Sequence, residues 1–108
     1  MKLQSGPFDS IKSGQKTIEV RLYDEKRSEV KLGDVIIFKR EPEQTEIVRA
    51  EVIGLLRYRT FIDLANDFSA SCFGHADKED LLKSIYTFYT KEQEEQYGVL
   101  GIRIRLAI

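Results

Sequence analysis

The chain has 108 residues, of which 42% are hydrophobic and 32% are charged. Length predicts one domain over residues 1–108, and the composition is typical of an ordinary soluble globular protein. One cysteine (Cys72) excludes an internal disulfide, and with one histidine (His75) it cannot complete a usual zinc site, so we expect no metal and no cofactor. We find no signal peptide and no apolar run near the roughly 20 residues that span a bilayer. We therefore expect a cytoplasmic protein that has no membrane partner and is a monomer.

The charged residues are unevenly distributed, although the net charge is only -1. Residues 12–40 hold eight Lys/Arg and five Asp/Glu, whereas residues 41–108 hold eight and twelve. A basic face with an acidic remainder would suit a polyanionic ligand. Chance clustering on a solvated surface is the alternative, because only the folded arrangement decides between the two.

In chain order, the sequence first predicts a helix and three strands. A proline and a glycine mark a short helix over residues 7–13. Apolar residues at every second position predict a strand with one buried face over residues 17–22. A further strand follows over residues 35–39, and a polar hairpin tip leads into the longest strand, residues 47–58. Gly54 within that strand indicates a bulge or a close backbone contact.

The second half of the chain predicts helices followed by one strand. Thr60, Asp77 and Thr90 are the expected N-caps of three helices, and Gly98 ends the last of them. Alternating apolar residues predict a C-terminal strand over residues 100–106. This order of elements predicts an α+β fold with a mostly antiparallel sheet. The final strand is long enough to pair with an early one and close a small barrel.

Three charged residues around the first predicted strand form a candidate site. Glu19 and Arg21 lie two apart and so share the polar face of that strand, and Lys16 lies just before it, behind Gly14. A carboxylate between two cations would stay ionised, with a lowered pKa, and accept hydrogen bonds from a base edge or an amide. The cations would suit phosphate or a carbonyl oxygen that develops charge. An exposed set of weak salt bridges is the alternative interpretation.

The segment from Gly14 to Arg21 resembles the signature of the ASCH domain, a family in the PUA-like group of β-barrels. That signature is Gly-x-Lys-x-x-Glu-x-Arg, which Gly14, Lys16, Glu19 and Arg21 match. Further blocks along nearly the whole chain resemble the short single-domain bacterial proteins of the family. These blocks are residues 7–8, 11–14, 22–27, 31–34, 58–61 and 95–99.

The resemblance implies a small PUA-like β-barrel with flanking helices and a cleft near the signature. ASCH domains are proposed to bind RNA there, so we expect RNA, a nucleotide or a modified nucleoside to bind at Gly14, Lys16, Glu19 and Arg21. One enzymatic branch hydrolyses the acetyl amide of N4-acetylcytidine with a lysine and a threonine three residues later. Lys16 matches that lysine, but Glu19 occupies the threonine position and cannot act as its hydroxyl. The sequence leaves open whether the chain is an enzyme.

If it is an amidohydrolase on acylated nucleosides, Lys16 and Glu19 are the candidate catalytic pair. A ribonuclease and a protein-interaction scaffold are further alternatives. Arg57 and Tyr58 could clamp a nucleotide at the end of the long strand, or Tyr58 could pack on the following helix. The aromatic residues within 86–89 could form a stacking platform, but their helical spacing favours core packing. The three-residue spacing of the cysteine and the histidine carries no catalytic signature.

Overall fold

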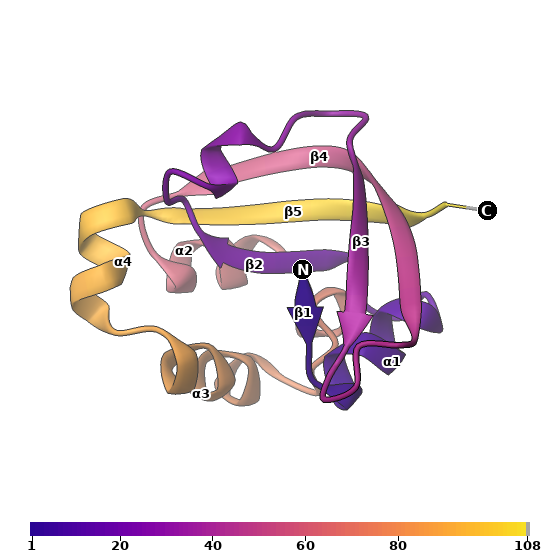
Figure 1. Ribbon diagram of the computed structural model, residues 1–108. Coiled ribbons are helices and arrows are strands. Elements are labelled where there is room, and N and C mark those ends of the chain that lie inside the picture. The colour runs from indigo at the N-terminus through magenta and orange to yellow at the C-terminus, as the bar shows by residue number, and fades with distance from the viewer. Residues whose placement is uncertain (108) are drawn as a thin grey trace.

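The structure is a computed structural model that describes residues 1–107. One five-stranded sheet curls round on itself, and helices pack against it (Figure 1). The strands are β1 (Lys2–Leu3), β2 (Ile18–Leu22), β3 (Val35–Arg40), β4 (Ile47–Tyr58) and β5 (Val99–Leu106). The helices are α1 (Ser5–Lys12), α2 (Phe61–Asp67), α3 (Lys78–Phe88) and α4 (Lys91–Tyr97). Two short 3-10 helices are η1 (Arg27–Glu29) and η2 (Ala70–Phe73).

The strand order is β1-β3-β4-β5-β2, so β1 and β2 are the two edges of the sheet. β1 runs parallel to β3, and the other neighbouring pairs are antiparallel. The predicted fold class is confirmed as an α+β fold with a curled, mostly antiparallel half-barrel and flanking helices. β5 pairs with the early strand β2, as its length predicts. No ladder joins β1 to β2 within residues 1–107, which leaves a seam between the two edges.

The longest strand is bulged where the sequence predicts it. The pairing of β4 with β5 shifts register between Val52 and Gly54. A Cβ atom at Gly54 would lie only 3.1 Å from Cδ of Arg103, so a larger residue would crowd the neighbouring strand. Both interpretations of this glycine, a bulge and a close contact, therefore hold.

The predicted caps begin three of the helices. The side chains of Thr60 and Asp77 each accept a hydrogen bond from the backbone N–H three residues later. Thr90 closes a capping box at the start of α4. The sequence missed β1, η1 and η2, because elements of two to four residues are too short to display a period. Helix α1 begins at Ser5, earlier than the proline that was expected to open it.

Buried side chains form two clusters on the two sides of β5. Leu100 and Ile102 belong to the cluster that includes residues of α1, β3 and β4. Val99 belongs to the second cluster, which includes residues of α2 and α3. Gly101 faces that second side, since a Cβ atom there would lie 3.2 Å from Cδ1 of Leu64 in α2. The first half of β5 is thus covered on both faces.

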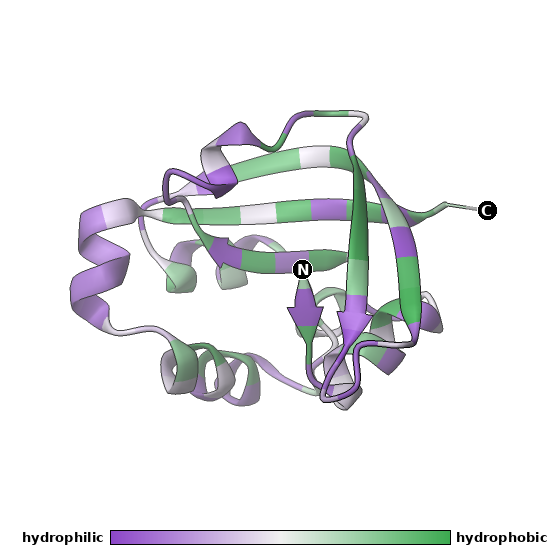
Figure 2. Ribbon diagram, viewed as in Figure 1, coloured by the Kyte–Doolittle hydropathy of each residue, from purple (hydrophilic) through white to green (hydrophobic). Residues whose placement is uncertain are grey.

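Helix α4 is attached by a buried carboxylate instead of an apolar face. Figure 2 shows hydrophobic and hydrophilic residues intermixed along β4 and β5, whereas α4 is hydrophilic over most of its length. Glu94 of α4 accepts a hydrogen bond from the N–H of Phe61 at 2.7 Å and from the hydroxyl of Tyr86 at 2.9 Å. These bonds connect α4 to α2 and α3. Within residues 1–107, no helix has the length and apolar character needed to cross a membrane.

Candidate functional site

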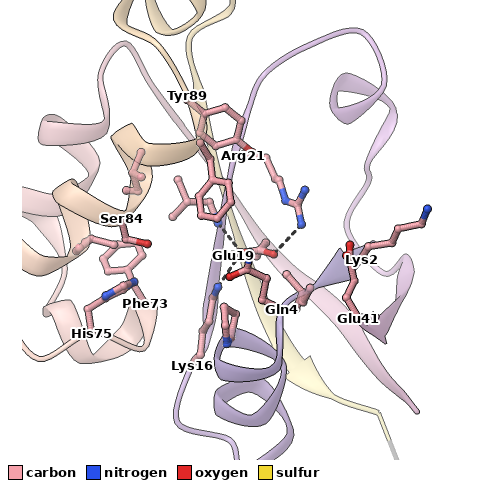
Figure 3. Close-up of a pocket in the computed structure, with 16 residues that line it drawn as sticks. Lys2, Gln4, Lys16, Glu19, Arg21, Glu41, Phe73, His75, Ser84 and Tyr89 are labelled. Carbon is pink, nitrogen blue, oxygen red and sulfur yellow. Dashed lines mark hydrogen bonds and ion pairs between the residues drawn. The ribbon is translucent and has the colours of Figure 1, made fainter. Parts of the chain in front are cut away.

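A pocket of about 500 Å³ lies between the two edge strands of the sheet (Figure 3). One wall is β2, and the facing wall is α3 with the loop that precedes it. Residues of β1 and of the start of α1 line a third side. The volume lies within the range of about 300–1,000 Å³ that is typical of small-molecule sites. The unpaired seam of the half-barrel therefore holds a pocket of the size that small-molecule sites have.

Lys16, Glu19 and Arg21 meet on the β2 wall of this pocket (Figure 3). Nζ of Lys16 lies 2.8 Å from Oε1 of Glu19, and Nη2 of Arg21 lies 3.1 Å from Oε2. The Glu19 side chain is 5% exposed, and those of Lys16 and Arg21 are 10% and 17% exposed. The three residues thus form a largely buried ionic cluster with one surplus positive charge. The alternative of exposed surface salt bridges is wrong.

Backbone contacts fix the position of Lys16 before β2 begins. Gly14 has φ +83°, a conformation that lets the chain turn sharply after α1. The N–H of Lys16 then donates to the carbonyl of Ser10 at 2.9 Å, and the N–H of Thr17 donates to the carbonyl of Cys72 at 2.8 Å. Gly14 does not line the pocket. Its contribution is the turn that directs Lys16 toward Glu19.

Both faces of β2 are covered, although its alternation predicts only one buried face. Glu19 and Arg21 share a face as predicted, but that face is the pocket wall and Glu19 is buried. Ile18 and Leu22 belong to the cluster on the side of α2 and α3. Hydrophobic alternation cannot detect this arrangement, because a charged residue in the pattern is read as solvent-facing.

Burial and charge act in opposite directions on the ionisation of Glu19. Burial alone raises the pKa of Glu19, but the charges of Lys16 and Arg21 and their hydrogen bonds bring it below its usual value. Burial would lower the pKa of Arg21, whereas Glu19 and then Tyr89 raise it, and the net pKa lies above its usual value. Glu19 and Arg21 therefore both stay charged at neutral pH, as the two flanking cations led us to expect for the carboxylate.

The facing wall is mainly apolar and includes aromatic surface. Leu81, Ile85 and Phe88 recur at helical spacing along α3, and Tyr89 follows the end of the helix. Phe88 is 62% exposed. A planar ligand that enters the pocket would thus meet an aromatic ring on one side and the ionic cluster on the other.

The aromatic residues of 86–89 divide between the core and the pocket. Tyr86 and Tyr89 pack on Phe61, with ring centroids 5.7 Å and 5.6 Å from it. The Tyr86 ring does not line the pocket, whereas Phe88 and Tyr89 do. The prediction of core packing therefore holds for Tyr86 and fails for Phe88.

Arg57 and Tyr58 lie apart from the ionic cluster. The guanidinium carbon of Arg57 lies 3.3 Å from the ring centre of Tyr23. The Tyr58 hydroxyl donates to Asp67 at 2.6 Å, and its ring packs against the hydrophobic cluster beside α2. This agrees with the alternative interpretation, in which Tyr58 packs on the following helix. Neither residue lines the pocket. Tyr58 and Leu22 both pair with Val99 of β5, which places Tyr58 level with the end of β2 that is remote from Lys16.

The sequence missed several polar residues of the pocket. These are Lys2, Gln4, Glu41 and Ser84, together with the ring of His75, which the sequence singled out only as a partner of Cys72. Lys2 and Glu41 are brought to the pocket by the pairing of β1 with β3, for which the sequence carries no signal. Within residues 1–107, no group of three or more His, Cys, Asp or Glu side chains could hold a metal ion.

The curled half-barrel and its flanking helices define a small α+β domain, and the comparisons with known proteins agree with this fold. The ASCH domain model matches residues 1–107, and the chain belongs to the ASCH domain family. The resemblance carried by Gly14, Lys16, Glu19 and Arg21 is thereby confirmed. The ASCH domain is generally regarded as an RNA-binding fold.

Two solved structures are similar to this chain over nearly its whole length. The crystal structure of hypothetical protein PH0355 has a TM-score of 0.83 and 34% sequence identity, and covers 99% of this chain and 96% of that one. The solution NMR structure of protein PF0455 from Pyrococcus furiosus has a TM-score of 0.75 and 31% identity, and covers 98% and 94%. No curated protein matches the chain.

Proposed function

We propose that this chain is a single-domain RNA-binding protein whose pocket takes one unstacked nucleotide or a modified nucleoside. The convergence of Lys16, Glu19 and Arg21 in a pocket of about 500 Å³ carries this proposal. The two cations offer N–H donors and positive charge to a phosphate or a base carbonyl. Phe88 and Tyr89 offer aromatic surface for stacking, which is the usual way in which proteins hold single-stranded bases.

Glu19 has the role of holding the two cations in place in this proposal. Its two oxygens accept hydrogen bonds from Lys16 and Arg21, so the cationic groups are fixed before a ligand arrives. Lys16 and Arg21 each have further N–H donors that do not point at Glu19. A pre-ordered pair loses little side-chain entropy on binding, and this supports affinity for a small ligand.

Hydrolysis of an acylated nucleoside, such as N4-acetylcytidine, is a second candidate function. It is favoured by the buried Lys16–Glu19 pair at 2.8 Å, since a lysine beside a carboxylate is placed to transfer protons. Lys16 would have to activate a water molecule, because Glu19 stands where the enzymatic branch has its threonine. Incubation with N4-acetylcytidine should then release acetate and cytidine. Absence of both products at high protein concentration would remove this candidate.

Titration with short single-stranded RNAs and nucleotides tests the binding proposal. We expect weak affinity that falls as salt is added, because cations contribute to it. Lys16→Ala and Arg21→Ala should each weaken binding roughly tenfold or more, which is the usual loss for a hydrogen bond to a charged group. Arg49→Ala removes the same charge from an exposed position outside the pocket and should leave affinity nearly unchanged. If Lys16→Ala and Arg21→Ala bind as tightly as Arg49→Ala and the wild-type protein do, the proposal is contradicted. Thermal unfolding of each variant shows that it is folded.

A further inference from the structure

His75 lies in the loop between η2 and α3, and its ring lines the pocket on the side of α3 (Figure 3). Its Nδ1 atom lies 2.8 Å from Oδ2 of Asp80, in the first turn of α3. Asp80 does not line the pocket. Nδ1 is therefore engaged with Asp80, and Nε2 is the ring nitrogen that remains for a ligand. No side chain within residues 1–107 forms a hydrogen bond with Nε2.

The loop that carries His75 is fixed beside the ionic cluster. The N–H of His75 donates to the carbonyl of Ala70 at 3.1 Å, and η2 is tied to the start of β2 by the backbone bond described above. Gly74, with φ +82°, packs on Lys16: a Cβ atom there would lie 3.5 Å from Cβ and Cδ of that lysine. His75 is thus held next to the Lys16 end of the cluster, and its position does not depend on a ligand.

Asp80 determines which nitrogen of the His75 ring carries the proton. An ionised carboxylate can only accept hydrogen bonds, so Nδ1 must donate. In the neutral ring Nε2 is then unprotonated and acts as an acceptor. Lys16 and Arg21, on the β2 side of the pocket, can only donate. With a neutral His75 ring, the pocket therefore offers donors from β2 and an acceptor from the loop before α3.

We propose that His75 contacts the ligand and accepts a hydrogen bond from one of its N–H or O–H groups. The pocket would then select nucleotides that present such a donor to His75 and an acceptor or anionic group to Lys16 and Arg21. Asp80 is a positioning residue, because it acts through the ring. This inference rests on the proposed nucleotide-binding function. A ribonucleotide can supply the donor from two sources, the exocyclic amino group of its base or the 2′-hydroxyl of its ribose.

Calorimetric titration with matched ligand pairs tests this selection. Two pairs test the exocyclic amino group, because their members differ only by that group: cytidine with zebularine, and adenosine with purine riboside. The 2′-hydroxyl is tested by comparing each ribonucleoside with its 2′-deoxy form. Wild-type protein should prefer the donor-bearing member of one kind of pair by roughly three- to tenfold. His75→Ala should abolish that preference by weakening only the donor-bearing ligand. His75→Gln, whose amide oxygen can accept, should keep part of it, and Asp80→Asn should reduce it.

The outcomes separate this inference from the function on which it rests. If Lys16→Ala loses binding while His75→Ala keeps the full preference, the role of His75 is wrong and the pocket proposal stands. Equal weakening of both members of every pair by His75→Ala, or no preference in the wild-type protein, would also overturn it. If the wild-type protein binds none of these ligands, both proposals fail. Lys83→Ala, at an exposed position of α3 that does not line the pocket, should behave as wild type throughout.

Discussion

Replacement of Glu19 by glutamine should lower the free energy of unfolding by about 3 kcal/mol, because two buried cations lose their counter-charge. Glutamine has nearly the same size as glutamate, so the loss reports charge and not a cavity. Lys16 and Arg21 keep 10% and 17% of their side chains exposed, and water in the pocket can partly solvate them. We therefore expect the lower end of the range for broken buried pairs. The change is measured by urea unfolding, with circular dichroism as the signal.

The matched control for this variant is Glu51→Gln, which breaks the more exposed pair of Glu51 with Arg105. It should change the free energy of unfolding by no more than about 0.5 kcal/mol.

The stabilisation by Glu19 should depend on pH, because its pKa in the folded state is lower than its usual value of 4.5. Its charge stabilises the fold fully above the usual pKa, and this stabilisation is lost as the pH falls through the folded-state pKa. Glu19→Gln should accordingly differ most from wild type at neutral pH. A difference that stays constant into strong acid would contradict this explanation.

Phe61→Ala should have the other large effect, a loss of about 3–5 kcal/mol in the free energy of unfolding. Phe61 is fully buried. Its ring stacks on Tyr89 at an interplanar angle of 16° and meets the edge of Tyr86 at 87°. A cavity at this place removes the support for Tyr89, a residue of the pocket wall. We therefore expect weaker ligand binding together with the lower stability, both measured on the same preparation.

Phe88→Ala is the informative comparison for this second prediction. Phe88 lines the pocket but is 62% exposed, so its removal leaves no cavity in the core. Its free energy of unfolding should change by no more than about 0.5 kcal/mol. Binding of a nucleotide should nevertheless weaken, because a stacking surface is lost. If Phe88→Ala binds as wild type does, α3 does not supply the stacking surface that we propose.

Local rules in the sequence predict most of the fold. The N-caps at Thr60, Asp77 and Thr90 and the bulge at Gly54 depend on residues that are close in the chain, and the structure contains all of them. The two-residue strand β1 is stable only because it pairs with β3, about 37 residues later in register, and no local pattern records such a contact. The same limit applies to the covering of β5 by α2, which depends on tertiary packing.

The candidate site was only half accessible to sequence reasoning. Lys16, Glu19 and Arg21 lie within one turn and one strand, so their spacing already places the two strand residues on one face. That Glu19 is buried depends on α3 and the N-terminal segment, which approach β2 from other parts of the chain. His75 and Phe88 reach the pocket in the same way. Arg57 and Tyr58 show the reverse case, since a suggestive local pattern lies outside the pocket.

Mapping of ligand contacts by nuclear magnetic resonance tests the central proposal, a nucleotide pocket between the edges of the half-barrel. Isotope-labelled protein would be titrated with a short single-stranded RNA and with a nucleoside monophosphate, and the backbone amide shifts followed. We predict that the largest changes cluster at residues 16–21 and at residues 75–89, the two facing walls of the pocket. Changes confined to the outer face of β3 and β4, with both walls unaffected, would contradict the proposed site.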